Sequence, residues 1–192
     1  MDTEQIIALV RHGETDWNLE RRWQGRTGVA LNETGRRQAR AAVDLLQDRP
    51  WQWMITSPQL RAKETGALIR AGLGELPTDT DPDLVERDYG AADGMLSAEA
   101  KRRWPDGNFP ESESNDLVGQ RGAAALRRIA EMRSAPGIVV AHGGLLRVAI
   151  NELCGIEAPR IINGSVSLLR PEEGRWQAVA LNLLPDGDIA YI

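Results

Sequence analysis

The chain has 192 residues, of which 42% are hydrophobic and 27% charged, and its net charge is −5. This length allows one domain with a substantial core, and the composition is that of an ordinary globular protein. A mildly acidic chain is a poor candidate for nucleic-acid or membrane binding, and no apolar run reaches membrane-spanning length. The single cysteine, Cys154, excludes an intramolecular disulfide and a cysteine-rich zinc site. Because the N-terminus lacks the basic start of a signal peptide, we expect a cytoplasmic protein.

Apolar runs of strand length alternate with segments of helical period along the chain. The runs are typical of strands buried on both faces, and the longer segments of amphipathic helices. In chain order we expect a strand at 6–10, a helix at 32–46, a strand at 53–56, a helix at 58–71, a short strand at 78–80, a short helix at 97–104, a helix at 116–132, a strand at 137–141, a helix at 144–153, and strands at 166–169 and 177–183. The alternation predicts a single α/β domain over 1–192, with a mainly parallel sheet covered by helices on both faces. Residues 73–115, rich in Pro, Gly, Asp and Ser, predict an irregular cap-like segment.

Two of the expected helices have recognisable capping residues. Thr34 is a possible N-cap for the first helix. For the second helix, we expect Ser57 as N-cap, Pro58 at the first helical position and Gly72 as the stop.

The only two histidines, His12 and His142, occupy equivalent places in the pattern. Each directly follows a buried-type strand, and each is followed by glycine. Ligands of parallel α/β sheets bind at the carboxyl ends of the strands, so this placement favours function over a structural role. The glycines that follow, Gly13, Gly143 and Gly144, let a ligand approach backbone amides, although a tight turn would use the same residues.

Arginines add positive charge near these strand ends. Arg61 lies in the first turn of the helix that follows the second strand, where amides, dipole and guanidinium all favour an anion. Arg11, Arg21, Arg22 and Arg26 form an early cluster that suggests an anionic ligand, although a solvated surface explains such a cluster more simply.

The irregular segment contains two carboxylates, Glu86 and Asp88, either of which could serve as an acid or base. Together the residues suggest phosphoryl transfer: a neutral imidazole attacks phosphorus, cationic groups stabilise the transferring oxygens, and a carboxylic acid protonates the leaving alkoxide. No metal is required for this chemistry. The sequence contains neither a P-loop motif nor His-Glu-x-x-His.

These motifs resemble the histidine phosphatase superfamily, also called the phosphoglycerate-mutase-like family. The resemblance covers nearly the whole chain and has four parts in the family's order. They are Leu9-Val10-Arg11-His12-Gly13-Glu14-Thr15, Thr56-Ser57-Pro58-Gln59-Leu60-Arg61-Ala62-Lys63-Glu64-Thr65, Leu84-Val85-Glu86-Arg87-Asp88-Tyr89-Gly90 and Val140-Ala141-His142-Gly143-Gly144. Asn163-Gly164-Ser165 and Trp176 are similar to late family positions.

The resemblance implies a three-layer α/β sandwich and a histidine acid phosphatase-type phosphomonoesterase with neither metal nor cofactor. His12 would be the nucleophile that becomes phosphohistidine, and Glu86 rather than Asp88 the proton donor. The catalytic set would be completed by Arg11, Arg61 and His142. The implied substrate contacts are Arg11, Asn18, Gly25, Arg61, Arg87, His142 and Gly143.

Two alternatives follow from the same resemblance. The family contains mutases, but those that resemble this chain carry an extra segment before the second histidine, where residues 94–138 are short. This shorter segment should leave the pocket more open to water than in a mutase, which favours hydrolysis by a phosphatase. A non-catalytic phosphoester-binding module is disfavoured because all five catalytic residues are present.

The substrate is expected to be a small phosphomonoester, with the oligomeric state left open. Arg21, Arg22, Arg26 and Arg87 could favour a second anionic group. Trp17 and Trp23 could pack on a sugar or a base, although ordinary core packing is the simpler role. The sequence also departs from the family pattern outside the catalytic set, with Gly28 and Ala30, Ala92 and Asp93, and Ser112.

Overall fold

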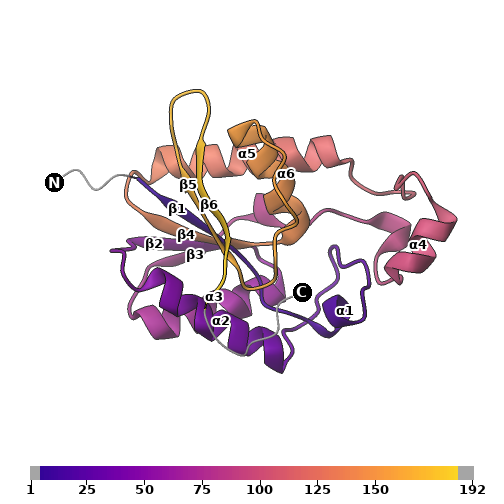
Figure 1. The fold of residues 1–192 in the computed structure, drawn as a ribbon, viewed down its shortest axis with the longest axis horizontal. Coiled ribbons are helices and arrows are strands. Elements are labelled where there is room, and N and C mark those ends of the chain that lie inside the picture. The colour runs from indigo at the N-terminus through magenta and orange to yellow at the C-terminus, as the bar shows by residue number, and fades with distance from the viewer. Residues whose placement is uncertain (1–4, 186–192) are drawn as a thin grey trace.

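A six-stranded sheet forms the centre of the protein in the computed structural model, which describes residues 5–185 (Figure 1). The strands are β1 (Ile7–Arg11), β2 (Trp53–Thr56), β3 (Thr78–Thr80), β4 (Gly137–Ala141), β5 (Val166–Arg170) and β6 (Gln177–Leu183), in the order β3-β2-β4-β1-β5-β6. The first four strands in this order are parallel, whereas β5 and β6 pair antiparallel at one edge. The expected mainly parallel sheet is therefore confirmed.

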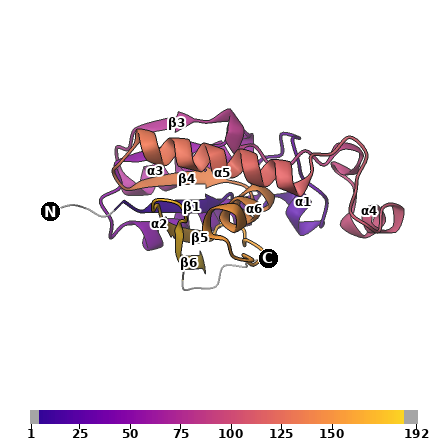
Figure 2. The same ribbon diagram turned by 90° about the horizontal axis from the view of Figure 1, so that it is seen from above.

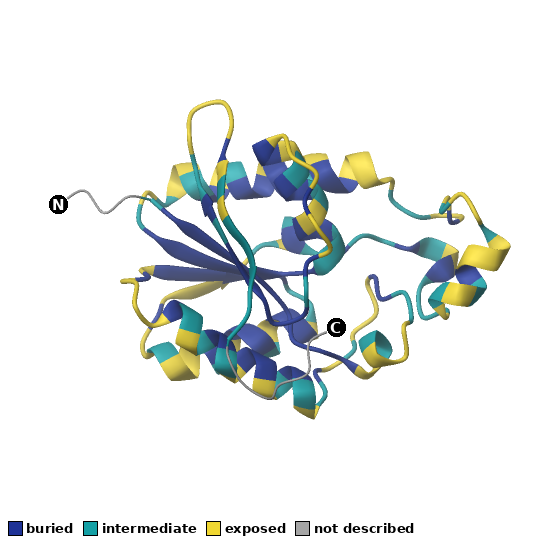
Figure 3. Cartoon of the chain, viewed as in Figure 1, coloured by how far each residue is buried: buried dark blue, intermediate teal, exposed yellow. Residues whose placement is uncertain are grey.

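Two helices cover each face of the sheet, which gives the three-layer sandwich (Figures 1 and 2). Helices α2 (Glu33–Leu46) and α3 (Leu60–Leu73) pack on one face, and α5 (Asn115–Met132) and α6 (Gly143–Cys154) on the other. Alternate side chains of β1 enter the two cores: Ile7 and Leu9 contact the α5–α6 side, Ala8 and Val10 the α2–α3 side. The sheet is consequently buried along most of its length (Figure 3).

The first expected cap lies two residues from the observed one. Asn32, not Thr34, is the N-cap of α2, and its side-chain oxygen accepts the Gly35 N–H at 2.8 Å. Asn32 also donates to Glu14 Oε1 at 2.8 Å. Asn is a preferred N-cap residue, and the bond to Glu14 holds the same side chain from a distant segment.

The bounds expected for α3 were also displaced toward the N-terminus. The helix begins at Leu60, with Gln59 as its N-cap, so neither Ser57 nor Pro58 holds the expected position. Gly72 lies inside the helix, where an added Cβ would stand 2.6 Å from the Val43 side chain of α2. The helix ends at Leu73, and its C-cap is Gly74, whose φ of +94° suits glycine.

The cap-like segment carries a small hydrophobic cluster of its own. It contains the 3-10 helices η1 (Pro82–Leu84) and η2 (Gly90–Ala92) and helix α4 (Ser97–Arg103), beside the short helix α1 (Asp16–Leu19) (Figure 2). The Trp23 ring packs 4.7 Å from the Tyr89 ring and 5.1 Å from the Phe109 ring. Trp23 is thus part of a packed cluster, as its simpler role required.

Strand register brings three chain segments to one edge of the sheet. Arg11 of β1 pairs with Ala141 of β4, and Thr56 of β2 pairs with Val140. The residues that follow these strand ends, among them His12 and His142, must therefore lie side by side. Strand register alone therefore places these residues together, without a contribution from the loops.

The start of β4 leaves no room for a side chain. An added Cβ on Gly137 would lie 2.0 Å from the Trp53 indole, whose Nε1 donates to Ala135 O. Gly137→Ala should therefore lower the free energy of unfolding by about 2 kcal/mol, as overpacked core sites do. Thermal and urea unfolding would measure this loss. Gly28→Ala is the matched control, since nothing lies within 4 Å of that position. Equal stability of the two variants would contradict the prediction.

Candidate active site

His12 is held as a neutral imidazole with one defined tautomer. Its backbone N–H donates to Ala141 O at 3.0 Å, and its side chain is buried. The ring Nδ1 lies 2.7 Å from Gly13 O, and Arg61 Nε donates to Nε2 at 3.2 Å. A carbonyl only accepts and a guanidinium only donates, so the proton lies on Nδ1 and the lone pair on Nε2. His12 can therefore act as a nucleophile through Nε2.

Arg61 is a fully buried cation whose hydrogen bonds go to neutral groups. Its Nη1 donates to Thr27 O at 3.0 Å and its Nη2 to Gly25 O at 2.8 Å. Burial lowers the pKa of Arg61 to about 10, although the nearby Glu86 and Asp93 charges oppose this effect. The guanidinium stays charged at neutral pH and is aimed at His12.

Arg11 and His142 each keep one buried polar atom without a protein partner among the described residues. Arg11 Nη1 donates to Ile161 O at 2.7 Å, and burial lowers the Arg11 pKa to about 10. Its Nε has no partner. His142 Nε2 lies 2.8 Å from Ser57 Oγ, whereas its Nδ1 is unpartnered. Buried polar groups normally pair, so these atoms mark a place for a polar ligand.

The two histidines and two arginines form one group. The His12 and His142 ring centroids are 5.2 Å apart. An added Cβ on Gly143 would lie 2.9 Å from Arg11 Nε, so glycine is required for the arginine to pass the start of α6. The structure thus brings together the imidazoles and guanidiniums that the sequence placed at the strand ends.

Glu86 joins this group by capping α6 from a distant part of the chain. Its carboxylate accepts the N–H groups of Gly144 and Leu145 at 2.9 and 2.8 Å, and that of Arg87 at 2.8 Å. An added Cβ on Gly144 would lie 2.6 Å from Glu86 Oε1 and 2.9 Å from the Tyr89 hydroxyl. Glu86 is buried beside both arginines and could exchange a proton with a bound ligand.

Asp88, the other carboxylate of this segment, points away from the site. It accepts the Gly90 N–H at 2.8 Å and faces Arg26 at 4.0 Å near the surface. Of the two candidate acids, only Glu86 lies with the histidines.

Asn18 and Asn163 connect the loop after β1 to the chain before β5. Asn163 Nδ2 donates to His12 O at 3.1 Å and to Asn18 Oδ1 at 3.1 Å. Asn18 also completes a capping box with Thr15 at the start of α1. The expected substrate contact Asn18 is therefore close to the His12 backbone, and its amide is fixed by protein bonds.

The remaining expected substrate contacts are placed differently. Gly25 offers its carbonyl to Arg61, and an added Cβ there would lie 2.8 Å from Arg87 O. Arg87 donates to Glu113 O and Asn115 Oδ1, at 2.8 and 2.9 Å, and its guanidinium lies over the Tyr89 ring. Gly25 and Gly143 shape the site, whereas the Arg87 cation is engaged at the cap.

The early arginine cluster divides into one buried and three surface residues. Only Arg11 belongs to the site. Arg22 pairs with Glu20 at 2.6 Å, Arg26 pairs with Glu113 at 3.3 Å, and Arg21 is exposed. The solvated-surface interpretation therefore holds for most of this cluster.

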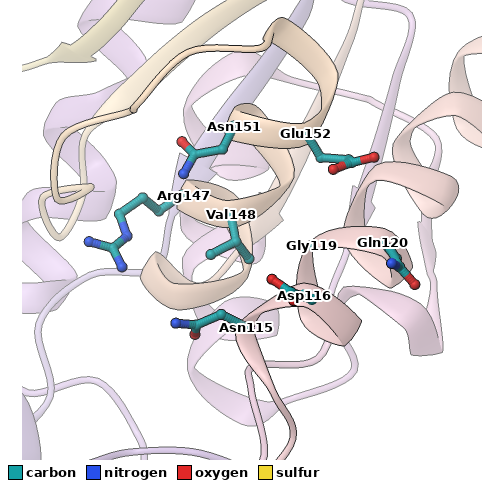
Figure 4. Close-up of a pocket in the computed structure, with 8 residues that line it drawn as sticks. All are labelled: Asn115, Asp116, Gly119, Gln120, Arg147, Val148, Asn151 and Glu152. Atoms are coloured by element: carbon teal, nitrogen blue, oxygen red, sulfur yellow. The ribbon is translucent and has the colours of Figure 1, made fainter. Parts of the chain in front are cut away.

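A polar groove lies between α5 and α6, apart from the histidines (Figure 4). Its volume is about 360 Å³, and Arg147 and Glu152 of α6 point to opposite sides of it. Neither histidine and neither buried arginine lines this groove. The site built around His12 is thus separate from it.

Sequence reasoning gave no site role to Ser57, Gln59 or Asn163. Ser57 contacts His142, whereas Gln59 accepts the Glu86 N–H at 2.9 Å and donates to Gly25 O at 2.8 Å. These contacts cross 27 residues or more, so no local pattern announces them. The one signal available was that all three residues fall inside the motifs of the family resemblance.

Comparison with known proteins decides the family. A model of the histidine phosphatase superfamily (branch 1) matches residues 7–184. The chain belongs to the histidine phosphatase superfamily.

Relatives within this superfamily carry phosphatase and mutase-like names. The uncharacterized phosphatase PhoE of Bacillus subtilis (strain 168) is 35% identical over 92% of this chain and 94% of its own length. The phosphoglycerate mutase-like protein 4 of Arabidopsis thaliana is 36% identical over 91% of this chain and 85% of its own. The structure of a mycobacterial glucosyl-3-phosphoglycerate phosphatase in complex with VO3 matches with a TM-score of 0.85 and 25% identity, covering 93% of this chain and 98% of that one.

No helix within residues 5–185 has both the length and the apolar character needed to cross a membrane.

The histidines of this superfamily member should titrate abnormally. Burial lowers the pKa of His12 well below 6.5, and the Arg61 and Arg11 charges lower it further. Burial and the same cations lower the pKa of His142 in the same way. Between pH 6.5 and the lower folded-state pKa values, the unfolded chain binds protons that the native chain does not. These histidines therefore stabilise the fold above pH 6.5, and their contribution is lost as the pH falls below it.

Because the chain has only two histidines, NMR can follow both rings directly. We expect both rings to remain neutral at pH 6, while the same residues in urea titrate near pH 6.5. A native ring that titrates at 6.5 or above would contradict the assigned environment.

Proposed function

We propose that this chain hydrolyses small phosphomonoesters, without a metal, through a phosphohistidine formed on His12. The observation that carries the proposal is the Nε2 lone pair of neutral His12, held beside Arg61 in a buried group with Arg11 and His142. Membership of a superfamily whose relatives include named phosphatases supports it. The domain as a whole, residues 1–192, would serve this one reaction.

In the first step, the Nε2 lone pair of His12 forms a bond to phosphorus as the bond from phosphorus to the ester oxygen breaks. The leaving oxygen takes a proton from Glu86 in its acid form and departs as an alcohol. The Nδ1–H bond to Gly13 O keeps the ring oriented and stabilises the positive charge that develops on it. Arg61 must exchange its bond to Nε2 for one to a phosphoryl oxygen, a small movement of a group already in contact.

In the second step, water attacks phosphorus and the phosphorus–nitrogen bond breaks. Glu86, now a carboxylate, accepts the proton of the attacking water, and the Nε2 lone pair returns to His12. Inorganic phosphate leaves, and Glu86 is again protonated for the next turnover. Protons and electron pairs balance over the cycle.

The charge that a metal would supply to the phosphoryl oxygens comes here from side chains. Arg11 and Arg61 are buried cations, and Arg11 Nε and His142 Nδ1 have no protein partner among the described residues. Fixed donors need no reorganisation to stabilise the negative charge that develops on the phosphoryl oxygens. This preorganisation supports metal-independent turnover.

Hydrolysis rather than mutase chemistry is favoured by the short cap. Between η2 and α5, the cap-like segment contains only the short helix α4 and loops. Helix α5 is then followed by strand β4 of the sheet. A small cap leaves the phosphohistidine open to water, whereas a mutase must protect it until the isomeric acceptor binds. Product analysis separates the two, since a phosphatase releases inorganic phosphate and a mutase returns an isomeric phosphoester.

The first test is hydrolysis of p-nitrophenyl phosphate with excess EDTA, for the wild type and His12→Ala. We expect wild-type turnover to resist EDTA and the substitution to lower kcat by about 10³-fold or more, because the nucleophile is lost. Circular dichroism would confirm that the variant is folded. Turnover that needs a metal, or that survives His12→Ala, would refute the phosphohistidine mechanism. Phosphate binding without turnover would indicate the non-catalytic module.

A second test separates the proton donor from the nucleophile. Glu86→Gln should lower kcat/KM for an alkyl phosphate by about 10²-fold or more, because an alkoxide must be protonated as it leaves. The loss should be much smaller for p-nitrophenyl phosphate, since nitrophenolate leaves unaided. Glu64→Gln is the matched control, because Glu64 also accepts a backbone N–H, from Leu31, but lies outside the group around His12. Equal losses for both substrates would exclude Glu86 as the acid.

A further inference from the structure

Asp93 fastens the loop that holds Arg61. Its Oδ1 accepts the Gly25 N–H at 2.7 Å, and its Oδ2 accepts the Thr27 hydroxyl at 2.7 Å and the Thr27 N–H at 3.3 Å. One carboxylate from the cap-like segment thus forms hydrogen bonds with both ends of the loop 25–27. Hydrogen bonds to a charged acceptor are stronger than those between neutral groups.

The same two loop residues are the ones that position the guanidinium of Arg61. Gly25 O accepts from Nη2 at 2.8 Å and Thr27 O from Nη1 at 3.0 Å, while the Arg61 Nε reaches His12. Asp93 accepts the N–H groups of Gly25 and Thr27, and Arg61 donates to the carbonyls of the same two residues. A chain of hydrogen bonds therefore leads from Asp93 through the loop and Arg61 to the Nε2 of His12.

The loop has few other anchors among the described residues. Arg26 and Thr27 are exposed, although Arg26 pairs with Glu113 at 3.3 Å, and nothing lies within 4 Å of a Cβ placed on Gly28. Gln59 donates to Gly25 O at 2.8 Å, which gives that carbonyl a second partner. The Thr27 carbonyl likewise accepts the Val29 N–H at 3.1 Å, so each carbonyl has a partner besides Arg61.

We propose that Asp93 is a positioning residue, which sets the guanidinium of Arg61 for phosphoryl binding by fixing the carbonyls of Gly25 and Thr27. The proposal rests on the proposed function, because the position of Arg61 matters to activity only if the pocket receives a phosphoryl group. Asp93 forms no hydrogen bond with His12 or Arg61, although its charge helps to hold up the Arg61 pKa. Its effect is transmitted through the loop.

The test measures binding of inorganic phosphate by calorimetry, so it does not depend on turnover. Asp93→Asn keeps the shape of the side chain but presents an amide N–H₂ to N–H donors, so at least one loop bond is lost. We expect phosphate to bind about tenfold more weakly, consistent with the loss of a charge-assisted hydrogen bond. Asp106→Asn is the matched control: Asp106 also accepts a backbone N–H, from Asn108, but it does not contact the 25–27 loop. This control should bind phosphate like the wild type.

A double-mutant cycle with Arg61→Lys distinguishes positioning from general support of the fold. A lysine ammonium cannot donate to both carbonyls and to His12 in the planar geometry of a guanidinium, so Asp93→Asn should change phosphate affinity by less than about twofold in that background. A loss of equal size in both backgrounds would show that Asp93 does not act through Arg61. Affinity within twofold of wild type in the single variant would also overturn the proposal.

Thr27→Val provides a second variant in case Asp93→Asn does not fold. It removes the hydroxyl that donates to Asp93 Oδ2 and leaves both loop carbonyls in place. We expect a smaller loss of phosphate affinity in the same direction, and wild-type affinity would count against the proposal. A wild type that binds phosphate but does not hydrolyse esters would refute the proposed function alone. A wild type that binds no phosphate would refute both.

Discussion

Two buried guanidiniums without a carboxylate salt bridge are the constraint around which this site is built. Arg61 is fully buried and Arg11 nearly so, and neither makes an ion pair within 4 Å among residues 5–185. Removing a cation from water costs several kcal/mol unless hydrogen bonds and opposite charge compensate. Here carbonyl oxygens accept the hydrogen bonds of both guanidiniums and the nearby Glu86 charge opposes the effect of burial, yet burial still lowers both pKa values to about 10. The rest of the fold must hold these charges in place, ready for an anion.

Burial and the same two charges determine the protonation state of His12. They disfavour a second proton on the ring, and Arg61 Nε can bond only to an unprotonated Nε2. The cations that would bind the phosphoryl oxygens therefore also help to keep His12 unprotonated, with its Nε2 lone pair available. Arrival of a dianionic phosphoryl group would relieve the repulsion between them and favour the positive charge that His12 acquires when it forms a bond to phosphorus. One electrostatic arrangement thus serves ligand binding and nucleophile activation.

Much of this arrangement could be predicted from the sequence because it is periodic. The apolar strands before His12 and His142 gave the sheet, and the parallel register then requires the two rings to meet. The start of α3 could not be predicted, because Ser57, a plausible cap, is engaged by His142 from 85 residues away. Asn32 rather than Thr34 is the N-cap of α2, and its side chain also donates to Glu14, 18 residues away. Contacts made between distant segments leave no mark on local spacing.

The contacts made by the cap-like segment, residues 73–115, were the least predictable part of the site. Glu86 and Asp93 act through backbone N–H groups, those at the start of α6 and in the 25–27 loop, and any sequence presents such groups. Which N–H groups these two carboxylates reach depends only on where the loops lie. The sheet edge therefore supplies an imidazole pair and a cation that depend on strand register, whereas the proposed proton donor Glu86 and the proposed positioning residue Asp93 lie in irregular segments. Loops tolerate change more readily than strands. Residues such as Glu86 and Asp93 could therefore be replaced in other chains of this fold while the chemistry proposed for His12 stays the same.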